Sequence, residues 1–214
     1  MINIKSFVCN MLQENCYIVN DETKQCVIID CGAYYPEEQQ AIREYICKNK
    51  LEPVHLIATH GHLDHNFGNA FIYKDYGLLP EVHENDSKSI THLNKQASDF
   101  FGMETNIAET KVGRLLEDRQ FVTFGNQHFK VLHTPGHSAG SIVLYCEEEN
   151  IIFTGDTLFH HSIGRTDFED GSMFEIIQSL RIISQLPDKT IVYPGHGITT
   201  TIGEEIRNNP YIDR

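Results

Sequence analysis

Four potential metal ligands lie within six residues, directly after one apolar run. The run ends at Thr59, and the segment HGHLDH then supplies His60, His62, Asp64 and His65. Because side chains alternate along an extended chain, His60 and His62 leave the run on the same side. Imidazole and carboxylate groups at this spacing can converge on a metal ion. A chain of this composition would contain the pattern by chance in only about two cases in a thousand.

The same segment constrains the fold, because it must lie where a strand is followed by a helix. Residues 54–59 predict a buried strand, Gly61 permits a tight bend, and Asp64 and His65 are predicted to begin the next helix. The alternative is that Asp64 only caps a helix N-terminus and that the histidines face solvent. Three later segments of the chain favour a metal site over this alternative.

These segments repeat one arrangement, a β-like run followed by a glycine and a potential ligand. The ligands are His137, Asp156 and His196. Ligand sites in α/β proteins lie beyond the carboxyl ends of strands, where glycine allows a close approach of the backbone. We therefore expect one site with seven donors, namely His60, His62, Asp64, His65, His137, Asp156 and His196. Seven donors are too many for one tetrahedral zinc ion and fit two metal ions about 3.5–4 Å apart.

β-like runs and helical patterns alternate along the chain. The expected strands span residues 2–8, 16–19, 26–30, 54–59, 120–124, 128–133, 141–146, 151–154 and 190–193. The expected helices span residues 36–49, about 65–76, 172 onward and 201–208, whereas residues 86–120 are polar and irregular in period. This order predicts an α/β (α+β layered) protein, a sandwich with helices outside. No linker divides the chain, so we expect a single domain over residues 1–214.

Charge and composition limit the partners of this chain. It contains 17 Lys and Arg against 30 Asp and Glu, a formal net charge of −13. A negative field opposes binding to nucleic acid and to anionic membrane surfaces. The apolar runs are too short to span a membrane, and the first ten residues do not resemble a secretory signal. We therefore expect a cytoplasmic protein with reduced cysteines and a small-molecule substrate.

Five motifs and the tail of the chain resemble the metallo-β-lactamase fold superfamily, and within it the short, single-domain glyoxalase II-like hydrolases. The motifs span residues 59–65, 134–137, 154–156, 164–168 and 193–197, and the similar tail spans residues 201–211. The resemblance implies an αββα sandwich with a metal site at one edge of its two sheets. It also implies that the first metal is held by His60, His62 and His137, the second by Asp64, His65 and His196, and that Asp156 bridges them.

The resemblance further implies a hydrolase of acyl thioesters that uses two divalent metal ions per chain, zinc foremost and iron or manganese as alternatives. Such ions lower the pKa of a shared water from about 15.7 toward 7. Asp64 would be the catalytic residue that orients this water and accepts a proton. A thiolate leaves with little help from an acid, so thioesters suit the site better than amides. The oligomeric state stays open.

Two departures from the family pattern narrow the expected substrates. Asp156 stands where true metallo-β-lactamases usually have cysteine or serine, so we do not expect antibiotic hydrolysis. After His196 the chain has too few polar groups to build a glutathione clamp, so we expect weak discrimination for that portion. Two alternatives stay open on the same scaffold. One is a persulfide dioxygenase with a single iron, which shares the GRTDF loop at residues 164–168, and the other is a lactonase.

One further motif imitates a different active site. Residues 136–140, GHSAG, match the nucleophile elbow of serine hydrolases. That elbow must open a helix, whereas the residues that follow predict a strand. A serine triad would also remove His137, Asp156 and His196 from the metal site, so we reject this interpretation.

Some loop residues have several possible roles. Arg165 and Asp167 are expected to brace a turn rather than to bind substrate. His160 and His161 are expected to be solvated and outside the site. The apolar residues Phe100, Phe101 and Met103 fit a substrate pocket, an oligomer contact or the core equally well.

Overall fold

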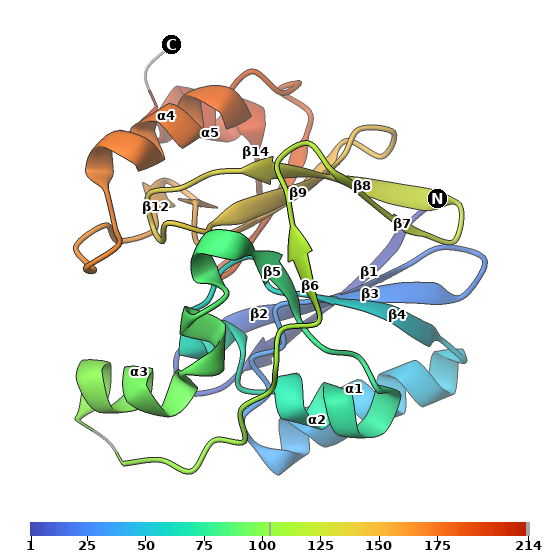
Figure 1. Cartoon of the computed structure of the whole chain (residues 1–214). Coiled ribbons are helices and arrows are strands. Elements are labelled where there is room, and N and C mark those ends of the chain that lie inside the picture. Colours follow the sequence, from blue (N-terminus) through green and yellow to red (C-terminus); the bar gives the residue numbers. More distant parts are fainter. Residues whose placement is uncertain (103, 213–214) are drawn as a thin grey trace.

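Two six-stranded sheets pack face to face in the computed structural model, which describes residues 1–102 and 104–212 (Figure 1). The first sheet has the order β1 (Asn3–Cys9), β2 (Glu14–Asn20), β3 (Gln25–Ile29), β4 (Glu52–Ile57), β5 (Glu81–His83) and β6 (Arg114–Leu116). The second has the order β14 (Thr200–Thr201), β13 (Ile191–Pro194), β10 (Ile151–Gly155), β9 (Ile142–Cys146), β8 (Gln127–His133) and β7 (Phe121–Phe124). A small hairpin pairs β11 (Leu158–Phe159) with β12 (Ser162–Ile163).

Helices cover the outer face of each sheet. Helices α1 (Pro36–Asn49) and α2 (Asn69–Tyr76) lie against the first sheet, and α4 (Met173–Ile183) and α5 (Ile202–Asn208) lie against the second (Figure 1). Helix α3 (Leu93–Phe101) lies toward one edge of the sheets. The predicted layered sandwich of helix, sheet, sheet and helix is therefore confirmed.

Alternation of side chains along the strands divides the core into layers. In β3, Val27 and Ile29 point between the two sheets, whereas Cys26 and Ile28 point toward α1 and α2. In β10, Ile152 packs toward α4 and α5. Because neighbouring residues of a strand face opposite sides, strands that are apolar throughout can be buried on both faces. This explains the continuous apolar runs of the central strands.

The expected helix over residues 65–76 is shorter in the structure and is preceded by a separate turn. A 3₁₀ turn, η1 (Leu63–His65), holds the metal-binding segment, and α2 begins only at Asn69. Between them Gly68 donates its N–H to the carbonyl of Cys31 at 2.7 Å. A side-chain carbon at Gly68 would lie 2.4 Å from the Cys31 Sγ. The chain therefore passes close to the end of β3 at Gly68, between η1 and α2.

Residues 86–120 contain elements that their irregular pattern does not predict. They include α3, β6 and the 3₁₀ turn η3 (Ser89–Thr91), and another 3₁₀ turn, η2 (Glu84–Asp86), ends at their first residue. Strands of three residues such as β5 and β6 are too short to show a period. Their register comes from parallel pairing with β4 and with each other.

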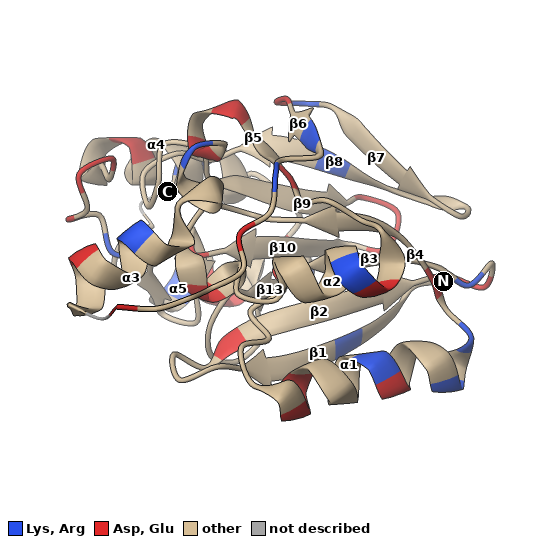
Figure 2. Cartoon of the chain, turned by 60° about the horizontal axis from the view of Figure 1, so that its bottom comes forward, with Lys and Arg blue, Asp and Glu red and all other residues tan. Residues whose placement is uncertain are grey.

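Charged residues lie mainly on the helices and the loops, as Figure 2 shows. Both signs occur along α1, α2 and α3 in that view, so these helices expose a mixed polar face. None of the helices in the described ranges is long and apolar enough to cross a membrane.

Candidate metal centre

The loop after β4 fixes two histidines through its backbone. His60 and His62 are buried, and Asn66 donates to both of their carbonyl oxygens, at 3.0 and 2.7 Å. The N–H of Gly61 donates to Asp86 Oδ2 at 2.7 Å. These hydrogen bonds tie the bend to Asn66 and Asp86, which helps to hold the two imidazole rings in place.

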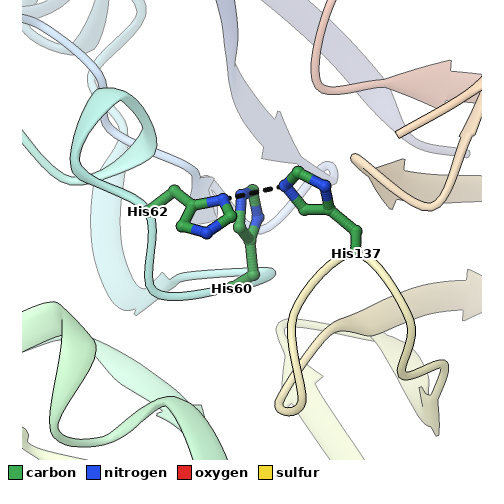
Figure 3. Close-up of side chains that lie close together, drawn as sticks. All are labelled: His60, His62 and His137. Carbon is green, nitrogen blue, oxygen red and sulfur yellow. Dashed lines mark hydrogen bonds between the residues drawn. The ribbon is translucent and has the colours of Figure 1, made fainter. Parts of the chain in front are cut away.

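His60 and His62 meet His137 from the opposite sheet, as Figure 3 shows. His62 Nδ1 lies 2.8 Å from His137 Nε2. His60 Nε2 is buried and has no hydrogen-bond partner. A buried nitrogen without a partner is costly unless it binds something. Three imidazoles that converge in this way form a suitable set of ligands for a divalent metal ion.

A second group of donors comes from η1 and from the loop after β13. Asp64, His65 and His196 have one ligand atom each within 4.8 Å of one another. His196 Nε2 lies 3.2 Å from Asp64 Oδ2 and 3.3 Å from His65 Nε2. This group can hold a second ion, next to the first.

Asp156, directly after β10, lies between the two groups. Its oxygens are 3.3 Å from His65 Nε2, 3.5 Å from His137 Nε2 and 3.7 Å from His196 Nε2. Its Oδ1 is buried and accepts no hydrogen bond. A side-chain carbon at Gly195 would lie 2.3 Å from this oxygen, so only glycine fits there. The unpartnered atoms and the carboxylate between the two triads fit a pair of divalent ions.

The Nδ1 atoms of His65, His137 and His196 each contact an oxygen atom of another residue. Such contacts orient metal-binding imidazoles and set their tautomer. The pairs are His65 Nδ1 with Asp30 Oδ2 at 3.1 Å, His137 Nδ1 with the Arg165 carbonyl at 2.8 Å, and His196 Nδ1 with the Leu12 carbonyl at 3.1 Å. The rings are therefore aimed at the centre before any ion binds.

The ionisation of His60, His62 and Asp156 suits a metal, whereas the carboxylates of the centre outweigh burial and raise the pKa of His65 and of His196. Burial, followed by the charges of neighbouring histidines, lowers the pKa of His60 well below its usual value and lowers that of His62 to about 3. Burial opposes ionisation of Asp156, but the charge of His65, followed by those of His137 and His60, holds the pKa of this carboxyl well below its usual range. Neutral imidazoles and ionised carboxylates are the forms that bind metal ions.

A cleft of about 580 Å³ opens over the centre. Phe100, Phe159 and Phe168 line it together with Asp64 and His196. Pockets of this size with apolar walls and a few converging polar groups are typical of sites for small molecules. The geometry therefore provides a small-molecule site directly at the candidate metal centre.

Comparison with known proteins agrees with this arrangement. The family model of the metallo-beta-lactamase superfamily matches residues 9–196. The chain belongs to this superfamily. It is 33% identical to hydroxyacylglutathione hydrolase GloC of Haemophilus influenzae over 214 residues, with 99% of each chain covered. This membership makes the chain a metallo-hydrolase of the same fold.

Two solved structures are similar over almost their whole length. The crystal structure of the BLEG-1 B3 metallo-beta-lactamase has a TM-score of 0.88 and 32% identity, covering 98% of this chain and 99% of that one. The structure of TTHA1623 in a di-iron-bound form has a TM-score of 0.85 and 33% identity, covering 97% and 100%. The resemblance inferred from the sequence motifs is thereby confirmed.

The structure of this superfamily member brings all seven expected ligands to one edge of the two sheets. His60, His62, Asp64 and His65 come from the first sheet's side, and His137, Asp156 and His196 come from the second. Backbone hydrogen bonds join the two sides here. Ile142 donates to the Thr59 carbonyl at 2.8 Å, and Asn15 donates to the Gly195 carbonyl at 2.7 Å.

Sequence reasoning missed two buried carboxylates that support the ligands. Asp30 accepts hydrogen bonds from the N–H and the hydroxyl of Thr59, both at 2.7 Å, besides its contact with His65. It follows β3 directly, so its place at a strand end was the available signal. Asp86 accepts from Gly61 and Gly140 and thereby joins two ligand loops. Its neighbours in the sequence give no comparable signal.

The serine of the GHSAG segment has a structural role. Ser138 is buried, and its hydroxyl donates to Asp86 Oδ2 at 2.7 Å. The segment leads into strand β9 and not into a helix. The rejection of a serine nucleophile is therefore confirmed by the local structure.

The loop after Asp156 has mixed roles. Arg165 forms two hydrogen bonds with Asp167, at 2.7 and 2.8 Å, and its guanidinium lies 4.4 Å from the ring centroid of Phe168. It braces the turn as expected, and it also lines the cleft. His160 and His161 stack on each other, and His161 lies 3.0 Å from Glu204 Oε1, in a separate group outside the cleft lining.

The apolar residues of α3 are also placed. Phe100 and Phe101 are 43% and 48% exposed and line the cleft, so they do not belong to the core. Met103 lies outside the described residues.

Proposed function

We propose that this metallo-hydrolase binds two divalent metal ions, zinc foremost, and hydrolyses acyl thioesters. The observation that carries the proposal is the pair of ligand triads with Asp156 between them. The relative named hydroxyacylglutathione hydrolase and the di-iron-bound structure support it. Because imidazole and carboxylate donors suit iron as well as zinc, iron is the occupant that experiments must distinguish from zinc.

The residues of the centre divide the work of hydrolysis. When bound, divalent ions lower the pKa of water and polarise an acyl carbonyl. Asp64 lines the cleft beside His196 and can orient the attacking water and accept its proton. Burial opposes its ionisation, but His65 and His196 outweigh this and lower the pKa of Asp64. Asp64 is therefore ionised at neutral pH.

The cleft favours a leaving group that needs no acid. Among the described residues that line the cleft, Arg165 is the one with a Lys or Arg type of cation, and its guanidinium is paired with Asp167. An amide nitrogen must be protonated as it leaves, whereas a thiolate is already a stable anion. Thioesters thus fit these walls better than amides do. The net charge of −13 further supports a small substrate over nucleic acid.

Steady-state kinetics on two thioesters tests the proposal. The metal-loaded protein should hydrolyse S-lactoylglutathione and the lactoyl ester of a simple thiol. Because no described residue of the cleft lining offers an unpaired Lys or Arg to the glutathione carboxylates, the kcat/KM values of the two esters should differ by less than about tenfold. His161→Ala serves as the control, because His161 lies outside the cleft and should keep both activities. No turnover of either ester would refute the thioester proposal, and a large preference for glutathione would reveal contacts that we do not assign.

The structural likeness to a B3 metallo-beta-lactamase favours β-lactam hydrolysis as a second candidate. A β-lactam releases an amine, for which general-acid help is worth about 10²–10⁴ in rate. We therefore expect kcat/KM for a chromogenic cephalosporin to be at least about 100-fold below that for a thioester. The reverse order would make the β-lactam the better substrate class.

A further inference from the structure

A small apolar recess adjoins the cleft beside the metal-binding loop. Its volume is about 60 Å³, against about 580 Å³ for the cleft. Both spaces are lined by Leu12, Leu63 and Phe101. The recess and the cleft therefore lie on either side of these three side chains.

The wall of the recess is apolar. Besides the three shared residues, Met11, Tyr34, Phe67, Ala97 and Thr105 line it, and only Tyr34 and Thr105 of these described residues carry a hydroxyl. No described residue of this wall carries a charge. Apolar cavities hold water poorly and accept alkyl or aryl groups.

The recess begins next to the reacting atoms. Leu63 stands between the ligands His62 and Asp64 in η1. The carbonyl of Leu12 faces His196 Nδ1 at 3.1 Å. These two leucines therefore place the recess directly beside the metal centre.

The other side of the cleft is polar. Phe100, the neighbour of Phe101 on α3, lines a groove of about 440 Å³ together with Lys88, Lys95 and Glu169. Phe101 thus lines the apolar recess, and Phe100 lines the polar groove. A thioester also has two unlike ends, an acyl chain and a thiol carrier that is usually polar.

We propose that the recess behind Leu12, Leu63 and Phe101 binds the apolar end of the acyl chain and makes the enzyme selective for short alkyl acyl groups. This inference rests on the proposed thioesterase function. Water adds to the acyl carbon and the carbon–sulfur bond breaks, which yields a carboxylate, a proton and a free thiol. The alkyl end is unchanged and serves only to bind.

The size of the recess sets the expected range. At roughly 30 Å³ for a water-sized group, a volume of about 60 Å³ holds about two methylene groups. Each methylene buried there should raise kcat/KM about fourfold. Longer chains should gain nothing more, because they would have to leave the recess.

A series of straight-chain thioesters of one simple thiol tests this inference. Acetyl, butanoyl, hexanoyl and decanoyl esters are compared by kcat/KM with metal-loaded protein. We expect a rise of about 15-fold from the acetyl ester to the best short ester, then a plateau or a fall. Calorimetric binding of the matching non-hydrolysable ketones should follow the same order.

Two variants change the recess in opposite directions. Ala97→Leu fills it from α3 and should abolish the gain with chain length. Phe101→Ala removes a half-exposed side chain from its rim and should shift the optimum to a longer chain. Ala41→Leu, a change of the same kind on the exposed side of α1, is the matched control and should keep the wild-type profile.

The outcomes separate the two proposals. If the wild type hydrolyses all the esters equally, or if both recess variants keep its profile, the inference is overturned while the thioesterase function stands. If no ester of any length is hydrolysed, the proposed function fails and the inference falls with it.

Discussion

Asp156 lies close to histidines of both ligand triads, whereas a ligand of a single ion would need to lie close to one triad only. Its two oxygens approach His137 of the first triad and both His65 and His196 of the second. A carboxylate in this place can support two ions at once. Removal of its side chain should therefore affect both ions, whereas removal of a terminal ligand should affect one.

We expect Asp156→Ala to lose more than one ion per chain. His161→Ala should keep the ions of the two triads, because His161 lies outside them, in a more exposed group with His160 and Glu204. Elemental analysis of the purified variants measures both. An empty site in His161→Ala together with a full complement in Asp156→Ala would show that the ligands are assigned wrongly.

Asp30 acts on the centre through His65. It is buried and joins the ring of His65 to the backbone and hydroxyl of Thr59. Carboxylates that orient a metal-bound imidazole typically contribute 10- to 100-fold to metal affinity, roughly. Asp30 is therefore a positioning residue for the second ion.

Asp30→Asn should lower the affinity for one of the two ions by about 10- to 100-fold and leave the affinity for the other nearly unchanged. Competition with a chromophoric chelator gives the two affinities separately. Asp75→Asn on the surface of α2 is the control for the same chemical change. Equal affinities in Asp30→Asn and the wild type would mean that the contact with His65 has no effect on the metal.

At the scale of elements, ligand positions at strand ends were predictable and supporting contacts were not. His137, Asp156 and His196 follow apolar runs and glycines, a pattern that is visible in the chain itself. The strand β5 has three residues, and its Glu81 is buried beside His55 and Arg114. Such a strand exists because of its neighbours, since no local period marks it.

The hydrogen bond between His55 of β4 and Glu81 of β5 gives a pH-dependent test of the pairing between these two strands. Burial favours the neutral form of His55, but its hydrogen bond with Glu81 and the charge of that residue outweigh burial and raise the pKa of His55. A pKa raised by folding stabilises the native state below the unfolded value, near 6.5. This contribution is lost as the pH rises through the folded value.

His55→Gln should therefore lower the free energy of unfolding by about 1 kcal/mol at pH 5.5 and by less at pH 8.5. Denaturant titrations of metal-depleted protein, each compared with the wild type at the same pH, provide the measurement. A larger loss at pH 8.5 than at pH 5.5 would contradict the sign of the shift.

At the scale of the whole molecule, the centre joins the two halves of the sandwich. Four of its seven donors follow β4 in the first sheet, and three follow strands of the second. Ions that bind here stabilise both halves together, because the unfolded chain lacks the site. The layers could be predicted from the sequence, whereas the meeting of the two sheet edges depends on contacts between distant residues such as Asp86 and Gly140.

Removal of the ions should therefore lower the melting temperature. An ion at 100 times its dissociation constant stabilises the fold by about 2.7 kcal/mol, which corresponds to about 5–10 °C for a chain of this size. Thermal unfolding with and without a chelator measures the difference, and Asp156→Ala should show little of it. If a chelator leaves the wild-type melting temperature unchanged, metal binding does not stabilise the fold and this prediction is wrong.

The metal content of the chain tests the central claim most directly. Protein purified without chelator, then saturated and freed of excess metal, is measured by elemental analysis. The two triads around Asp156 predict close to two ions per chain, with zinc as the main element. Reproducible binding of one iron, with no second ion after saturation, would contradict the dinuclear centre and favour a mononuclear oxygenase.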